Sequence, residues 1–155
     1  MKVASIPLWL DKATAALLEE TVSMLIKRHA NILLAVILFG SVARHEERPL
    51  DDSCPSDVDV LAIFDTTDRL VKPYREAIFA TIIDACALHL DAPRDVNVLL
   101  SERTMQTWDS MFLDNIVRDG IVLYARGPLP AQLAARQSLQ VRFEEKGLST
   151  IQQIL

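Results

Sequence analysis

Residues 32–65 decide how this chain folds, and they read ILLAVILFGSVARHEERPLDDSCPSDVDVLAIFD. The stretch opens with an uninterrupted apolar run, 32–39, whose length and branched residues are typical of a strand buried on both faces. Gly40 and Ser41 end that run, a polar segment follows, and 58–64 is a second apolar strand. The pattern predicts two buried strands joined by a turn and a loop.

The rest of the chain alternates helical and strand-like segments around this stretch. Ser101 has the chemistry of an N-cap, so one helix is expected from there to about Arg118, with Gly120 closing it. Periodicity predicts three further helices and two further strands, at residues 8–30, 68–90 and 133–146 and at residues 96–100 and 121–124.

These segments predict one α/β (α+β) domain with a mixed central sheet of about four strands covered by helices. We expect a single domain over 1–155, with a core at about 32–124 and a helical extension at about 128–155. A mean hydropathy of +0.20 and the apolar tail 148–155 predict a homodimer.

Composition limits the classes of function. Half of the 155 residues are hydrophobic and 24% are charged, which is typical of a globular protein. The net charge of −5 disfavours a nucleic-acid partner, which usually requires a basic face. A bilayer span needs about 20 apolar residues, so no membrane association and a cytoplasmic location are expected. Cys54 and Cys86 lie in different settings and predict neither a disulfide nor a zinc site.

Two acidic residues interrupt the apolar pattern where the second strand begins. Alternate side chains of a strand share a face, so Asp57 and Asp59 should project together while Val58 and Val60 enter the core. Two such carboxylates repel each other and raise each other's pKa unless a cation lies between them. Magnesium prefers carboxylate and phosphate oxygens. The pair therefore predicts a metal site.

The turn after the first strand suits a phosphate. Glycine at position 40 allows a close approach of the backbone to a ligand, and a helix beginning at Ser41 would offer free N–H groups to an anion. Arg44 could reach a phosphate or pair with an acidic residue of its own loop. Together with the acidic pair, these residues could seat a triphosphate and its metal.

The combination resembles the minimal nucleotidyltransferase domains of the DNA polymerase β superfamily, of the MNT type that includes antitoxins and kanamycin nucleotidyltransferase. The similarity consists of an apolar-Gly-Ser turn, a spacer and an apolar Asp-x-Asp strand, and it extends to a closing Val-Leu-Tyr element. In this chain those parts are Leu38–Ser41, Val42–Arg44, Asp57–Leu61 and Asn115–Tyr124. The spacer is longer than usual, and 49–56 is the expected insertion.

The resemblance implies a transferase that moves a nucleoside monophosphate, AMP from ATP, to a hydroxyl acceptor, with two Mg²⁺ ions. It implies nucleotide binding by Gly40, Ser41 and Arg44. It also implies metal binding by Asp57 and Asp59, which are expected to be catalytic. Minimal members often modify a small helical toxin, so a toxin-like protein partner is expected.

The third carboxylate of the family's site is the main departure. Its position on a later strand is occupied here by Asn97, which can ligate a metal but cannot accept a proton at neutral pH. Asp95 precedes it by two residues and is the alternative catalytic carboxylate; a solvated strand end is the other interpretation of that residue. If neither serves, the domain would be a catalytically degenerate module that binds nucleotide or a partner.

Overall fold

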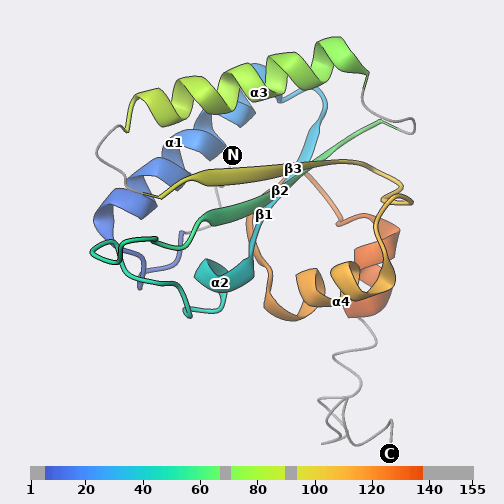
Figure 1. Ribbon diagram of the computed structural model, residues 1–155. Coiled ribbons are helices and arrows are strands. Elements are labelled where there is room, and N and C mark those ends of the chain that lie inside the picture. Colours follow the sequence, from blue (N-terminus) through green and yellow to red (C-terminus); the bar gives the residue numbers. More distant parts are fainter. Residues whose placement is uncertain (1–5, 67–70, 90–93, 138–155) are drawn as a thin grey trace, which may run out of the picture.

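The computed structural model describes residues 6–66, 71–89 and 94–137 of the chain. Helices and strands alternate along it (Figure 1). Their order is α1 (Lys12–His29), β1 (Leu33–Phe39), α2 (Gly40–Ala43), β2 (Val58–Phe64), α3 (Lys72–Ala87), β3 (Val96–Glu102), α4 (Ser110–Asp119) and β4 (Ile121–Ala125). A further helical segment covers 131–137.

The four strands form one mixed sheet in the order β3-β2-β1-β4. β1 lies antiparallel to both β2 and β4, whereas β2 and β3 run parallel and are connected through α3. The carboxyl end of β1 therefore meets the amino ends of β2 and β3 at the same edge of the sheet. This edge carries the residues on which the functional prediction depends.

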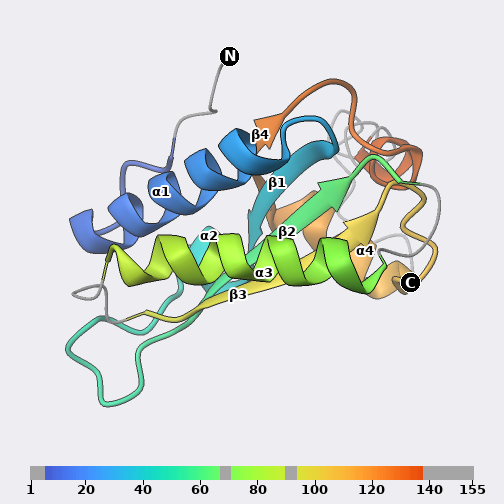
Figure 2. The same cartoon turned by 90° about the horizontal axis from the view of Figure 1, so that it is seen from above.

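Each face of the sheet has its own core. α1 and α3 lie next to each other over one face, and α4 lies under the other (Figures 1 and 2). The upper core joins α1 and α3 to the sheet through Leu18, Val22, Leu25, Val36, Leu38, Val60, Ile78 and Ile82, among others. The lower core includes Ile37, Leu61, Ile63, Met105, Leu113 and Ile116. Burying apolar area of this kind on both faces is the main stabilising contribution to such a fold.

The sequence predicted this mixed sheet of four strands covered by helices, and the prediction is confirmed. The second strand has the predicted bounds, and the first begins one residue later than predicted. α1 begins at Lys12 rather than at residue 8, because Asp11 caps it by accepting a hydrogen bond from the Thr14 N–H at 2.8 Å. The predicted tail 148–155 and most of the last predicted helix lie outside the described residues.

One predicted helix start is wrong. Ser101 is not an N-cap, because it and Glu102 continue β3 alongside Ile63 and Phe64 of β2. β3 continues past its apolar run because β2, its partner strand, is long enough to pair with these two residues. α4 begins nine residues later at Ser110, where the preceding residue, Asp109, caps it by accepting from the Phe112 N–H at 2.8 Å.

Within the described ranges, no helix combines the length and apolar character needed to cross a bilayer. Both cysteines are free thiols.

Candidate functional site

The site lies where β1 ends and where β2 and β3 begin. Strand register places Asp59 between two neighbours, Phe39 on β1 and Asn97 on β3. Asp59 is therefore in the middle of the edge, with the Gly40 turn on one side and the start of β3 on the other. Asp57 lies immediately before the first residue of β2.

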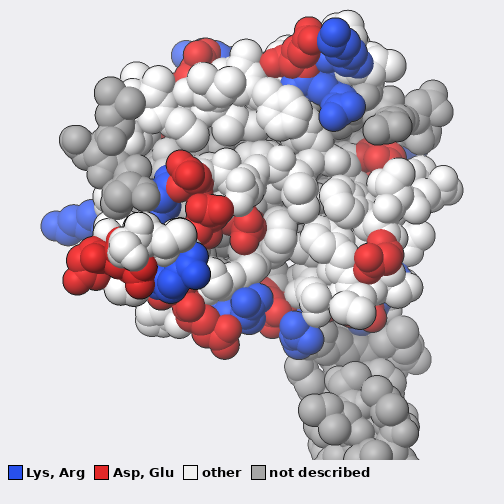
Figure 3. Space-filling model, viewed as in Figure 1, with Lys and Arg blue, Asp and Glu red and all other residues white. Residues whose placement is uncertain are grey.

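Alternation along β2 places the valines and the aspartates on opposite faces of the sheet, as the sequence predicts. Val58 and Val60 are completely buried in the upper core. Asp59 is half-buried on the opposite face, and Asp57 is exposed. Figure 3 shows acidic side chains gathered on this surface, over the starts of β2 and β3.

A single amide joins the two carboxylates. The side-chain nitrogen of Asn97 donates to Asp57 Oδ2 at 3.1 Å and to Asp59 Oδ1 at 3.3 Å. One oxygen of each carboxylate therefore faces the same point in space. An amide nitrogen carries a partial positive charge, so it occupies the place where a cation would relieve the repulsion between the two acids.

Gly40 allows the turn to lie against Asp59. Its φ of 75° belongs to the left-handed region, which glycine adopts without steric cost. A Cβ at this position would lie 2.5 Å from Asp59 Oδ2. Both the backbone conformation and the space therefore require glycine. Ser41 follows directly, in the four-residue helix α2, whose amino terminus has no side-chain cap among the described residues.

Burial raises the pKa of Asp59 above its ordinary value. The hydrogen bond from Asn97 opposes that shift, the negative charge of Asp57 adds to it, and the positive charge of Arg44 opposes it. The rise is the expected cost of holding a partly buried carboxylate beside another one. A bound cation would remove this cost.

Arg44 faces acidic groups in this structure. Its guanidinium contacts Glu46 of its own loop, with 3.0 Å between Nε and Oε2, and lies 3.8 Å from Asp119 Oδ2 at the end of α4. Of the two predicted partners of Arg44, a phosphate or an acidic residue of its own loop, the structure therefore shows the acidic residue. Because Glu46 and Arg44 are both substantially exposed, the pair is worth at most about 1 kcal/mol and can rearrange around a ligand.

Asp95 lies at the same edge but outside the hydrogen-bonded cluster. It is exposed, and its backbone carbonyl accepts from the Val58 N–H at 2.8 Å. Burial raises the pKa of the Cys86 thiol on α3, and the charge of Asp95 raises it further. The catalytic role of Asp95 stays a prediction.

The donor set fits a hard divalent cation. Asp57 and Asp59 each direct one oxygen to the point occupied by the Asn97 amide nitrogen, and turning that amide would present its oxygen instead. Among the described residues there is no group of three or more His, Cys, Asp or Glu side chains suited to a metal. The group lacks a third member because Asn97, which contacts both carboxylates, has an amide side chain and not a carboxylate.

Sequence reasoning missed Arg94, which precedes β3. Its side chain is buried, and it donates to two backbone carbonyls, those of Arg48 and Ser56, at 2.7 and 2.9 Å. These partners lie 46 and 38 positions away in the chain. A backbone carbonyl has no signature in a sequence, so no pattern could have identified this contact.

Comparison with known proteins gives matches among solved structures. No family model and no curated protein matches the chain. The structure is similar to a chain of a toxin–antitoxin complex with AMP-PNP, at 17% identity and a TM-score of 0.48, covering 83% of this chain and 93% of that one. It is also similar to a chain of a tri-AMPylated Shewanella oneidensis HEPN toxin in complex with an MNT antitoxin, at 17% identity and a TM-score of 0.43, covering 84% and 94%. A third similar chain belongs to an MntA–HepT toxin–antitoxin complex, at 16% identity and a TM-score of 0.43, covering 83% and 84%.

Proposed function

We propose that this chain is a metal-dependent nucleotidyltransferase that transfers AMP from ATP to a hydroxyl acceptor. The observation that carries the proposal is the geometry around Asp59. Its carboxylate converges with that of Asp57 on one point and lies directly against the positive-φ glycine of the β1–α2 turn. An acidic pair beside a bare backbone turn suits a metal and a polyphosphate together.

Each residue has a defined part in this proposal. Asp57 and Asp59 would hold Mg²⁺, with Asn97 as a third ligand through its amide oxygen. The bound cation supplies neutralisation of the triphosphate charge and lowers the pKa of the acceptor hydroxyl. The N–H groups of Gly40 and Ser41 would donate hydrogen bonds to phosphate oxygens at the start of α2, where the described residues provide no side-chain cap.

The reaction exchanges a phosphoanhydride bond of ATP for a phosphate ester bond to the acceptor. The acceptor oxygen bonds to the α-phosphorus, and the bond from that phosphorus to the bridging oxygen breaks, so pyrophosphate leaves. The hydroxyl proton passes to a carboxylate at the edge, for which Asp95 is the candidate because Asn97 cannot accept it. Positioning and charge neutralisation provide most of the rate.

A protein hydroxyl is the acceptor that we propose, on the strength of the resemblance to MNT-type domains. The test mixes the chain with Mg²⁺, ATP labelled at the α-phosphate, and the product of the neighbouring reading frame. Label on that protein together with pyrophosphate release supports the proposal. ATP that stabilises the chain only with Mg²⁺, but transfers no label, would refute transferase activity towards that acceptor.

A second candidate function follows from Asn97 itself. Its amide already bridges the two carboxylates, and this offsets part of their repulsion without any metal. A chain with this arrangement could bind nucleotide or a partner without turnover. Binding of ATP that is equally strong in Mg²⁺ and in EDTA, with no pyrophosphate release, would favour this function over transfer.

A further inference from the structure

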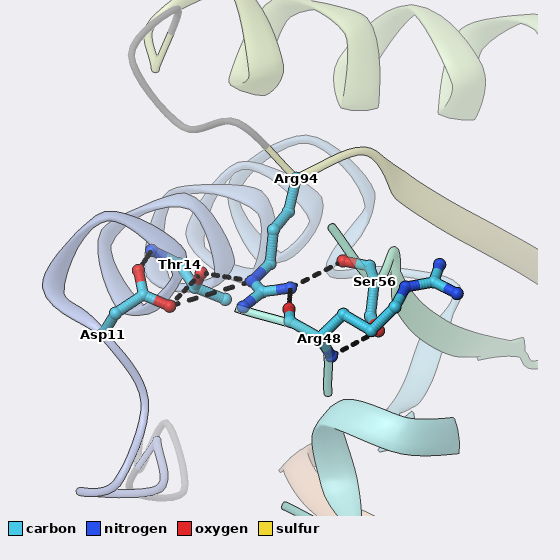
Figure 4. A network of polar contacts seen from close by, with 5 residues as sticks. All are labelled: Asp11, Thr14, Arg48, Ser56 and Arg94. Carbon is cyan, nitrogen blue, oxygen red and sulfur yellow. Dashed lines mark hydrogen bonds and ion pairs between the residues drawn. The ribbon is translucent and has the colours of Figure 1, made fainter. Parts of the chain in front are cut away.

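Arg94 places a full positive charge inside the protein, next to the proposed site. The residue is 5% exposed, and it lies just ahead of β3. Its Nη1 donates to the carbonyls of Arg48 and Ser56, and its Nε donates to Thr14 Oγ1 at 3.2 Å and lies 3.8 Å from Asp11 Oδ2 (Figure 4). A buried guanidinium is costly unless its donors are satisfied. This one has polar partners from the start of α1 and from both ends of the 48–56 loop.

The backbone around Asp57 is held on both sides by residues 94 and 95. The carbonyl of Ser56 accepts from Arg94 Nη1 at 2.9 Å, and the N–H of Val58 donates to the carbonyl of Asp95 at 2.8 Å. Asp57 itself precedes β2, so its own position is not set by the regular strand. These two bonds therefore fix the peptide units on either side of it.

We propose that Arg94 is a positioning residue that places the Asp57 carboxylate beside that of Asp59, and so sets the affinity of the site for a divalent cation. The inference rests on the proposed function. Arg94 acts through the backbone of Ser56 and not by touching either carboxylate. Its connection to Asp11 and Thr14 ties that backbone to the capped start of α1, which is packed on the sheet.

The chain contains a matched control for this role. Arg126 also donates to two backbone carbonyls, those of Ala30 and Asn31, both at 3.0 Å, and it also pairs with an aspartate, Asp65, at 3.1 Å. It does so at the opposite end of the sheet, beyond the carboxyl end of β2. Arg126 is more exposed than Arg94, but lysine at 126 loses a similar number of bonds without touching the Asp57 backbone.

The experiment measures Mn²⁺ binding to the full chain by electron paramagnetic resonance, without nucleotide, in the wild type, Arg94→Lys and Arg126→Lys. Removing a partner that orients a metal ligand typically costs about 10–100-fold in affinity, and we expect about tenfold for Arg94→Lys. Arg126→Lys should bind as the wild type does. Equal affinities in the two variants overturn the inference.

A second readout does not depend on metal. The ¹³Cγ resonances of the aspartates are recorded without metal, with Asp57 assigned from Asp57→Asn. The Asp57 signal should move in Arg94→Lys and stay in place in Arg126→Lys. If the wild type binds no Mn²⁺, the proposed function fails, and an unmoved Asp57 resonance then overturns the positioning role separately.

A milder variant covers the case in which Arg94→Lys does not fold. Asp11→Asn keeps the acceptor for the Thr14 N–H but removes the negative charge 3.8 Å from Arg94 Nε. Its Mn²⁺ affinity should fall by about threefold, less than for loss of the guanidinium itself. An affinity unchanged from the wild type, with an unmoved Asp57 resonance, overturns the proposal.

Discussion

The two ends of β2 both carry acidic residues, but the side chains that contact these acids differ in charge. At the carboxyl end, Asp65 pairs with two arginines, Arg103 at 2.9 Å and Arg126 at 3.1 Å. At the amino end, Asp57 and Asp59 share only the neutral amide of Asn97 in the hydrogen bonds that join the cluster.

The difference is the one expected between an acid that joins elements of the fold and an acidic pair that binds a ligand. A carboxylate that only joins elements gains from a cationic side chain of the same chain. A pair whose repulsion is only partly offset lowers stability, and such pairs concentrate at functional sites. The amino end of β2 has that character, and the following experiments test the contrast from its largest expected effect to its smallest.

Asp59→Asn should abolish the proposed function while making the metal-free protein more stable. Loss of a metal ligand should reduce AMP transfer on the order of 10³-fold, as measured by pyrophosphate release. The melting temperature in EDTA should rise, because the substitution removes a half-buried charge whose pKa is raised.

The matched variant at the other end is Asp65→Asn. It should leave transfer unchanged and lower the free energy of unfolding by about 1 kcal/mol, since its ion pairs are partly exposed. If both variants lose stability, or both lose transfer, the contrast between the two ends of β2 is wrong.

Gly40→Ala should damage both stability and the site. The positive φ and the contact with Asp59 should together cost about 2 kcal/mol or more in the free energy of unfolding, measured by urea denaturation. Nucleotide binding should weaken because Asp59 must move. Gly127→Ala is the control, since an added Cβ there meets no described atom within 4 Å. Equal effects at the two glycines would refute the requirement for glycine at 40.

Asn97→Asp should sharpen the contrast by completing a cluster of three acids. Metal affinity should rise by about tenfold, measured by Mn²⁺ titration, because a carboxylate is the harder and charged ligand. Without metal the variant should melt at a lower temperature, since the bridging N–H donor is lost and a third negative charge is added. An unchanged metal affinity would show that the cation does not bind beside residue 97.

The smallest effect is the pH dependence of the stability gained by Asp59→Asn. A carboxyl group whose pKa is raised by folding favours the folded state when protonated and costs stability when ionised. The difference in metal-free melting temperature between Asp59→Asn and the wild type should therefore be largest at neutral pH. It should shrink as the pH falls through the raised pKa of Asp59 towards the ordinary value of 3.8. A difference that is constant with pH would exclude charge as its cause.

The sequence predicted those parts of the molecule that depend on local patterns. β2 coincides with its predicted range, because the residues between Asp57 and Asp65 are all apolar except Asp59. Strand alternation predicted that Asp57 and Asp59 share a face, and the family resemblance predicted that Asn97 occupies the position of a third metal ligand. The structure brings these three together, whereas their roles with metal and nucleotide stay predictions.

Long-range contacts could not be read from local patterns. The extension of β3 through Glu102 depends on the length of β2, and the partners of Asp65 are arginines 38 and 61 positions away. Arg94 acts on backbone carbonyls, which every residue has. Such contacts can be predicted only once the order of the strands in the sheet is known.

The bonds between Arg48, Ser56 and Arg94 also close a neck at the base of a surface loop. The Arg48 N–H donates to Ser56 Oγ at 2.7 Å, and the Arg94 side chain joins both of their carbonyls. Residues 49–55 project beyond this closure and are mostly exposed (Figure 2). Doubling a loop's length adds only about 0.6 kcal/mol of closure entropy. New chain termini, a fluorescent probe or a whole inserted domain can therefore be placed at 51–53, while the neck keeps the sheet edge in position.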